Sequence, residues 1–225
     1  FNLDPVEFIK FNSKTKFICN FSANKLSNNK DELYSERVKV IEFFNSFYSD
    51  KFDLYGHGWD KAYRHPFVYN IFRFLNKNKI FRGISKVLIN IQLFDKLLFT
   101  NYTVYKGPVA NKFQVLKQYK FSICFENIKN VDGFITEKIF DCFVCGVIPI
   151  YLGPKNIDKT IPKSTFIDMR DFSSYSKLFD YLSEMKESEY KIYINNIKLY
   201  LQSEKIKYFD SKWASNYFVK KILSL

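Results

Sequence analysis

The residues best suited to chemistry lie in one polar stretch between two apolar runs. They are Glu126, Asn127, Thr136, Glu137 and Lys138. The first two follow the β-prone run 119–125, and the others come after a loop with Gly133, where the helix-like apolar run 135–145 begins. Ligands of open α/β sheets bind at the carboxyl ends of strands and at helix N-termini, so these residues are placed to bind one.

Lys138 sets an electrostatic problem in this stretch. A cation in the first turn of a helix is opposed by the helix dipole, and an anion bound at the same helix start would remove the conflict. Glu137 beside it favours a helix N-terminus and could accept hydrogen bonds from sugar hydroxyls. Two interpretations stay open at this point: a binding site for an anion, or a surface turn that these two residues merely decorate.

Strands and helices alternate around the polar stretch. The sequence predicts strands at 16–22, 52–55, 119–125, 147–151 and 165–167. It predicts helices at 32–48 and 135–145, from a cap at Asp171 or Ser173 to about 186, at about 189–202, and at about 205–223. Gly146 ends the central helix, and Gly153 with Pro154 makes a turn after the fourth strand. This alternation predicts an α/β fold with a parallel sheet and helices on both faces.

One segment looks like an insertion between the second and third strands. Residues 61–94 contain no Asp or Glu, and their second part places apolar residues at helical spacing. Their first part mixes aromatic side chains with Arg64, Arg73, Lys77, Lys79 and Arg82. The segment fits a helical hairpin packed on the core, or a basic amphipathic element on an anionic membrane surface.

Composition and charge narrow the class of protein. The 225 residues are 47% hydrophobic and 26% charged, which allows a packed core. The net charge of +12 suits an anionic partner, such as a nucleotide diphosphate, a nucleic acid or a membrane surface, but also a merely solvated basic surface. No apolar run predicts a transmembrane helix, and the first residues lack the pattern of a signal peptide.

The four cysteines are expected to be free thiols. Cys142 and Cys145 form a CxxC inside an apolar helical run, and no second pair or nearby His completes a zinc site. Together with Cys19 and Cys124 they are interpreted as buried thiols of a reducing compartment. The absence of GxGxxG after the first strand disfavours a nicotinamide dehydrogenase.

The polar stretch and its flanks resemble glycosyltransferase family 10, the α1,3/α1,4-fucosyltransferases. The shared segments are Phe125-Glu126-Asn127, Phe134-Ile135-Thr136-Glu137-Lys138 and, at 146–153, GVIPIYLG. Looser similarity includes the strand at 17–22 with Asn24 and Arg37 after it, the segment 52–56 and the segment 105–107. The resemblance covers about residues 16–170, apart from 61–103.

The resemblance implies the donor-binding half of a GT-B-type glycosyltransferase. Residues 1–225 would form a GDP-fucose-binding, Rossmann-like domain, with a helical insertion at 61–103 and C-terminal helices at 189–225. The implied reaction moves fucose from GDP-fucose to a hydroxyl of a glycan acceptor with inversion. No cofactor is expected, and no metal, since no clear DxD motif is present. The general base is expected outside this chain; His57 and Asp60 are weaker candidates within it.

The family pattern also assigns roles to single residues. The catalytic set is Arg37, Glu137 and Lys138, and the donor-binding set is Asn24, Arg37, Glu126, Asn127, Phe134, Thr136, Glu137 and Lys138. Arg37 and Lys138 would contact the diphosphate and neutralise the charge that grows as GDP departs. Glu137 would bind ribose or fucose hydroxyls. Phe134 stands where the family often has Tyr, which puts in doubt a hydrogen bond from that position.

Two alternatives remain beside the transferase. One is a fragment that binds GDP-sugars without activity of its own. The other is a basic module for membranes or nucleic acid, which rests on the charge and on residues 61–94 but does not explain the helix start at Glu137. The preferred interpretation has GDP-fucose and a glycan acceptor as partners and no nucleic acid. It places the protein in the cytoplasm, with an acceptor on a lipid carrier, as in lipopolysaccharide, at the inner face of a bacterial membrane.

Overall fold

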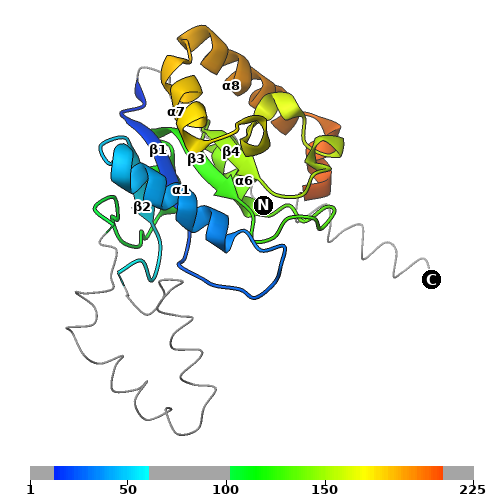
Figure 1. Ribbon diagram of the computed structural model, residues 1–225. Helices are drawn as coiled ribbons and strands as arrows, with labels where there is room; N and C mark the ends of the chain where they lie inside the picture. Colours follow the sequence, from blue (N-terminus) through cyan, green and yellow to red (C-terminus); the bar gives the residue numbers. More distant parts are fainter. Residues whose placement is uncertain (1–12, 61–101, 210–225) are drawn as a thin grey trace, which may run out of the picture. The chain divides into compact units, whose positions relative to one another are not determined.

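The computed structural model describes residues 13–60 and 102–209, and the insertion predicted at 61–103 lies almost wholly outside them (Figure 1). The chain divides into two compact units. The larger unit comprises Phe1–Cys19 and Asn111–Leu225, and the smaller unit comprises Asn20–Ala110. The boundary falls within the first strand, so this strand contributes residues to both units.

Five strands form one sheet in the order β2-β1-β3-β4-β5. They are β1 (Lys16–Phe21), β2 (Phe52–Tyr55), β3 (Tyr119–Phe125), β4 (Ile148–Leu152) and β5 (Ile167–Asp168). β3 pairs in parallel with β4, and β4 with β5, which confirms the predicted parallel sheet. Phe125 is opposite Leu152 in this register, so β3 and β4 end side by side. The residues that follow the two strands therefore emerge together at one edge of the sheet.

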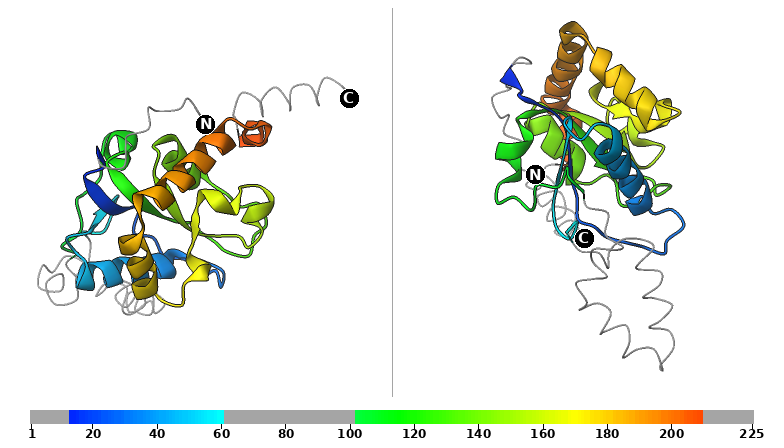
Figure 2. Two further views of the ribbon diagram at one scale, coloured as in Figure 1. Left: turned by 90° about the horizontal axis from the view of Figure 1, so that it is seen from above. Right: turned by 60° about the vertical axis from the view of Figure 1, so that its left-hand side comes forward.

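Helices of the larger unit cover both faces of its strands, as predicted (Figure 2). They are α5 (Lys112–Leu116), α6 (Glu137–Val144), α7 (Tyr175–Glu184) and α8 (Glu187–Leu201). Side chains of a strand alternate between its faces. On one face of β3, the Cys124 thiol contacts Cys142 of α6. On the other face, the Phe121 ring packs edge-on against Phe17, which in turn packs against Phe179 of α7.

The smaller unit packs α1 (Tyr34–Phe47) beside β2. The Phe44 ring of α1 stacks on the Phe52 ring of β2, with 4.9 Å between their centroids. The Trp59 indole nitrogen donates to the Ser22 carbonyl oxygen at 2.7 Å. These contacts confirm the predicted helix and strand in this part of the chain.

Two elements differ from their prediction at the level of single residues. The predicted strand 165–167 is displaced to β5 because residues Lys163–Thr165 form a 3₁₀ turn, whose Thr165 hydroxyl donates to the Pro162 carbonyl oxygen at 2.7 Å. The N-cap of α7 is Ser174, whose hydroxyl accepts from the Lys177 backbone N–H; neither Asp171 nor Ser173 caps it. Loop hydrogen bonds thus decide where both elements begin.

The C-terminal part of the described chain also differs from prediction. α8 begins at Glu187, two residues earlier than predicted. The start of the predicted helix 205–223 is a 3₁₀ segment, Glu204–Phe209, and the rest of that prediction lies outside the described residues. The Phe209 ring packs against Phe140 of α6 with 4.5 Å between centroids.

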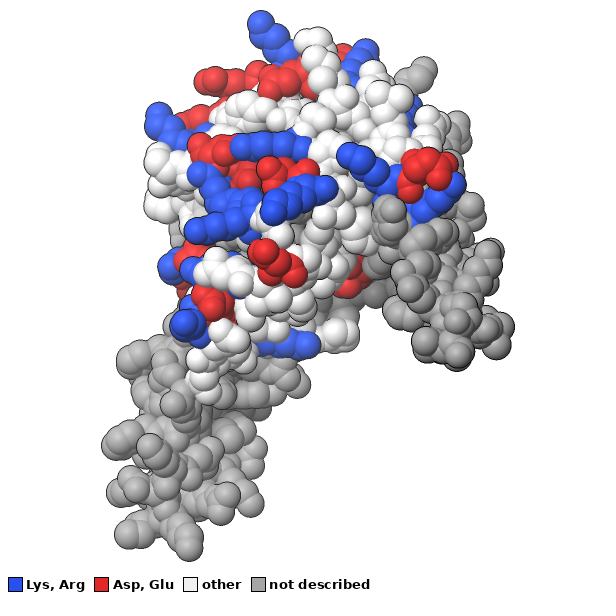
Figure 3. Space-filling model, turned by 90° about the vertical axis from the view of Figure 1, so that its right-hand side faces the viewer, with Lys and Arg blue, Asp and Glu red and all other residues white. Residues whose placement is uncertain are grey.

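The described part of the chain has a mixed surface charge. On the face drawn in Figure 3, basic and acidic side chains are interspersed. Within residues 13–60 and 102–209, no helix is both long enough and apolar enough to cross a membrane.

Candidate functional site

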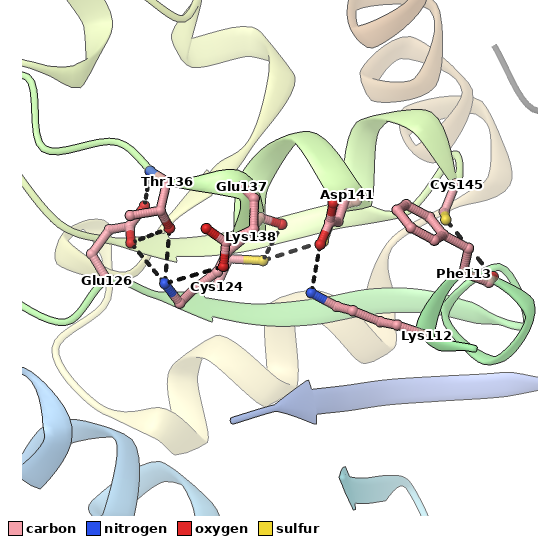
Figure 4. Close-up of polar contacts among 10 residues, drawn as sticks. Lys112, Phe113, Cys124, Glu126, Thr136, Glu137, Lys138, Asp141 and Cys145 are labelled. Atoms are coloured by element: carbon pink, nitrogen blue, oxygen red, sulfur yellow. Dashed lines mark hydrogen bonds and ion pairs between the residues drawn. The ribbon is translucent and has the colours of Figure 1, made fainter. Parts of the chain in front are cut away.

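Glu126 follows the last residue of β3 and carries a fully buried side chain, with 0% of it exposed. Its backbone N–H donates to the Leu152 carbonyl oxygen at 2.7 Å, which continues the pairing of β3 with β4. Its Oε1 accepts the Thr136 backbone N–H at 2.9 Å, and its Oε2 accepts the Thr136 hydroxyl at 2.7 Å (Figure 4). Burying a carboxylate is costly unless it is paired and hydrogen-bonded. The two bonds from Thr136 meet this need, and they also tie together the two ends of the loop between residues 126 and 136.

Lys138 completes the cluster with its ammonium group. Its Nζ lies 3.1 Å from Glu126 Oε2 and 2.8 Å from Thr136 Oγ1, and 16% of its side chain is exposed. The buried carboxylate thus offsets the unfavourable interaction of this cation with the dipole of α6. An ammonium has three N–H donors, and these contacts engage two of them. The arrangement holds a positive charge at the helix start in one place.

Thr136 is the N-cap residue of α6, but its side chain makes no capping bond to the helix. A capping Thr ordinarily accepts from the backbone N–H of the second or third helical residue. Here the Thr136 hydroxyl instead donates to Glu126 and accepts from Lys138. The N-terminus of α6 therefore keeps its capacity to hold an anion through backbone N–H groups.

Glu137 occupies the first position of α6 with a more exposed side chain. Its Oε1 lies 3.9 Å from Lys138 Nζ, and 55% of the side chain is exposed. An exposed carboxylate at this position is placed to accept hydrogen bonds from a ligand beside the helix start. Sequence reasoning placed Glu137 and Lys138 together, but it missed that Lys138 is held chiefly by Glu126.

The loop that leads to α6 is built from two tight turns. The Phe134 N–H donates to the Val131 carbonyl oxygen at 3.1 Å, and the Ile135 N–H donates to the Gly133 carbonyl oxygen at 2.8 Å. Gly133 has a φ of +73°, a conformation that L side chains rarely adopt. These turns place Phe134, which is partly exposed, next to Ile135 and Thr136 at the start of the helix.

Ion pairs and thiols tie the body of α6 to its surroundings. Asp141 Oδ2 accepts from Lys112 Nζ at 2.7 Å. The Cys124 thiol lies 3.2 Å from the Cys142 sulfur and 3.5 Å from the Lys138 carbonyl oxygen (Figure 4). All four cysteines are free and buried, as expected. Burial raises the pKa of Cys145 to about 12, so this thiol stays protonated at neutral pH.

Tyr151 of β4 lies beside this cluster and was missed by sequence reasoning. Its side chain is fully buried, and its hydroxyl has no hydrogen-bond partner among the described residues. A Cβ added to Gly153 would lie 2.4 Å from the Tyr151 hydroxyl oxygen and 2.9 Å from Glu126 Cγ. Tyr151 and Glu126 therefore converge over this glycine. The signal in the sequence was a tyrosine near the end of an apolar strand, followed by a glycine.

Other predicted site residues belong to the smaller unit or to the loop. Asn24 is buried, and its side-chain amide donates to the Gly58 carbonyl oxygen at 3.1 Å. Arg37 is buried in α1, with its guanidinium 5.2 Å from the centre of the Tyr34 ring. His57 and Asp60 are exposed, and Asn127 is partly exposed. The residues brought together within the larger unit are thus Glu126, Thr136, Glu137 and Lys138.

No metal cluster accompanies these residues. Over the described ranges, no group of three or more His, Cys, Asp or Glu side chains is arranged to hold a metal ion. The cluster at the start of α6 presents one ammonium group and a helix N-terminus, which are elements of an anion site.

Residues 61–216 match the family model described as "Glycosyltransferase family 10 (fucosyltransferase) C-term". The chain is 39% identical over 74 residues to "Alpha-(1,3)-fucosyltransferase FucT" of Helicobacter pylori, which covers 33% of this chain and 15% of that protein. It is 37% identical over 87 residues to "4-galactosyl-N-acetylglucosaminide 3-alpha-L-fucosyltransferase 9" of Mus musculus, covering 38% and 24%. The chain thus spans no more than a quarter of either relative's length.

A structure titled "Crystal Structure of alpha1,3-Fucosyltransferase with GDP-fucose" aligns with a TM-score of 0.46 and 20% sequence identity. The alignment covers 82% of this chain and 39% of that one.

Proposed function

Because the chain belongs to glycosyltransferase family 10, the fucosyltransferases, we propose that it is the donor-binding part of an inverting fucosyltransferase. This enzyme would move fucose from GDP-fucose to a hydroxyl of a glycan acceptor. The observation that carries the proposal is the Glu126–Thr136–Lys138 cluster at the start of α6, within the residues that match the family. A rigidly held ammonium beside a helix N-terminus suits the diphosphate of a sugar nucleotide.

The same groups suit the chemistry of fucose transfer. Negative charge grows on GDP as the bond to the sugar breaks, and a fixed cation stabilises it without reorganisation during the reaction. We assign this role to Lys138. Glu137 would accept hydrogen bonds from ribose or fucose hydroxyls, because its carboxylate is exposed at the helix start. The general base would come from outside this chain.

The remaining donor contacts are proposed from the family pattern. Asn127 and Phe134 flank the loop that leads to α6 and would border the nucleotide, with Phe134 offering a ring but no hydroxyl. Asn24 would act through the turn that it holds at Gly58. Positive charge supplied by side chains would also make the reaction independent of a metal ion.

A calorimetric titration tests the proposal with four ligands: GDP, GDP-fucose, GDP-mannose and UDP-galactose. We expect GDP to bind at least tenfold more tightly than UDP-galactose, and GDP-fucose to bind more tightly than GDP-mannose. Absence of GDP binding, or a preference for the uridine nucleotide, would refute the assignment. Donor binding with no fucose transfer to a glycan, even when the part of the enzyme that supplies the general base is present, would instead support the alternative of a binding fragment.

We further propose that the acceptor is lipid-linked and that the protein touches an anionic membrane from the cytoplasmic side. The support is the acid-free segment 61–94, in which Arg64, Arg73, Lys77, Lys79 and Arg82 lie among aromatic residues; each basic residue is worth about 1 kcal/mol near an anionic surface. Four free thiols suit a reducing compartment. The protein should sediment with anionic vesicles at low salt, and replacing the five basic residues by Gln should abolish this while GDP binding is kept. An unaltered protein that stays in the supernatant would refute the membrane contact.

A further inference from the structure

The Tyr151 hydroxyl is a buried polar group that the proposed site does not yet use. Its side chain is fully buried, and its hydroxyl has no hydrogen-bond partner among the described residues. Buried polar groups are nearly always hydrogen-bonded, because an unmet donor is destabilising. We therefore expect the Tyr151 hydroxyl to gain a hydrogen-bond partner in another state of the protein.

The nearest chemistry available to this hydroxyl is the Glu126 carboxylate. The Tyr151 hydroxyl and Glu126 Cγ both lie within 3 Å of the point where a Cβ on Gly153 would stand. Burial raises the pKa of Tyr151, and so do the negative charge of Glu126 and the close approach of the hydroxyl to that carboxylate, although the two groups do not meet in hydrogen-bond geometry. The hydroxyl therefore keeps its proton at neutral pH and can act as a hydrogen-bond donor.

Glu126 would lose a hydrogen-bond donor, the Lys138 ammonium, when an anionic ligand binds. It now receives two hydrogen bonds from Thr136 and one from the Lys138 ammonium. A diphosphate at the start of α6 would compete for that ammonium, because both anions attract the same cation. Glu126 is fully buried and water does not reach it, so the donor that replaces Lys138 must come from the protein.

We propose that Tyr151 is a positioning residue: its hydroxyl donates a hydrogen bond to Glu126 when the Lys138 ammonium turns toward the diphosphate of the bound nucleotide. This inference rests on the proposed function. No covalent bond changes, and no proton leaves either residue. The exchange lowers the cost of moving the ammonium from its internal partner to the ligand, and it leaves Glu126 hydrogen-bonded in both states.

The test compares Tyr151→Phe with Tyr190→Phe, which removes a buried hydroxyl that does have partners. The Tyr190 hydroxyl donates to the carbonyl oxygen of Gly146 at 3.2 Å. Tyr151→Phe should keep or raise the melting temperature of the unliganded protein and weaken GDP binding roughly threefold to tenfold, the range for one net hydrogen bond. Tyr190→Phe should lower the melting temperature and leave GDP affinity unchanged.

Two further measurements separate positioning from pocket shape. Guanosine has no phosphate, so its binding should be the same in Tyr151→Phe and the unaltered protein. In a Lys138→Met background, where no ammonium can be released, Tyr151→Phe should cause no further loss of GDP affinity.

The inference is overturned if Tyr151→Phe binds GDP as tightly as the unaltered protein, or if it weakens guanosine and GDP equally. A large fall in the melting temperature of Tyr151→Phe would also overturn it, because the hydroxyl would then be structural. If the unaltered chain binds no GDP, the proposed function fails first and this inference fails with it.

Discussion

Replacing Lys138 by Met removes the ammonium that lies 3.1 Å from the buried Glu126 carboxylate. Removing one partner of a buried ion pair typically costs about 3–5 kcal/mol, because the other charge stays buried. Thr136 still donates two hydrogen bonds to Glu126 in this variant, so we expect the lower end, about 3 kcal/mol. At roughly 2–4 °C per kcal/mol for a chain of this size, the melting temperature should fall by about 6–12 °C.

A double-mutant cycle isolates the pair. Glu126→Gln alone should cost about 2 kcal/mol, since Lys138 is partly exposed and can turn to water. Once Glu126 is neutral, Lys138→Met should cost little more. The two substitutions together should therefore cost about 2 kcal/mol less than the sum of their separate costs. Urea unfolding followed by far-UV circular dichroism measures all four proteins.

The matched control is an exposed ion pair on the same unit. Lys163 Nζ lies 3.1 Å from Asp171 Oδ2, but 60% and 51% of these side chains are exposed. The same cycle with Lys163→Met and Asp171→Asn should give a coupling below about 1 kcal/mol. A coupling at Glu126 and Lys138 that is no larger than at the control pair would refute the argument that burial makes the former strong.

Further predictions concern a buried lysine, a glycine, an exposed carboxylate and metal dependence. Burial lowers the pKa of Lys14 to about 8. Between pH 8 and about 10.4 the unfolded chain therefore binds more protons than the folded chain. Across this window the free energy of unfolding, measured with urea, should rise by roughly 3 kcal/mol more in the unaltered protein than in Lys14→Met. Gly153→Ala should lower stability by about 1–3 kcal/mol and weaken GDP binding, because its Cβ would overlap Tyr151 and approach Glu126. Glu137→Gln should keep the melting temperature and GDP affinity but depress fucose transfer. An equal loss of GDP binding and of fucose transfer would indicate a structural role. Excess EDTA should leave GDP affinity in calorimetry unchanged, and a loss that Mg²⁺ restores would contradict metal independence.

Much of the fold followed from local patterns in the sequence. Residues 52–55 and 119–125 were predicted with the bounds that the structure gives, because both runs are rich in aromatic and aliphatic residues and are flanked by polar or glycine residues. The five-residue α5 was missed, because a single turn capped by Asn111 leaves no periodicity to detect. β5 was misplaced because hydrogen bonds around Pro162 hold Thr165 in a turn, although the local sequence favours a strand.

The positions of the cluster residues in the fold were predicted, but the contacts between them were not. The motif put Glu126, Thr136 and Lys138 at the correct strand end and helix start. That Glu126 turns back onto the other two depends on the path of the loop between them, which no periodicity describes. Tyr151 was not predicted as a site residue for a related reason. A tyrosine in an apolar strand is usually a core residue, and its closeness to Glu126 depends on how both side chains pack over Gly153.

The charge balance of the cluster gives a reason for a carboxylate to lie beside a cation that we propose binds an anion. A lysine at a helix start, held by nothing, samples many rotamers, and ordering them on binding would cost free energy. Glu126 and Thr136 hold Lys138 in one place without a ligand. The free energy needed to bury Glu126 is therefore part of folding and does not weaken ligand binding. The price of this arrangement is competition, since Glu126 and a diphosphate attract the same ammonium. A second donor for Glu126 relieves that competition, and this is the part that the hydroxyl of Tyr151 is placed to take.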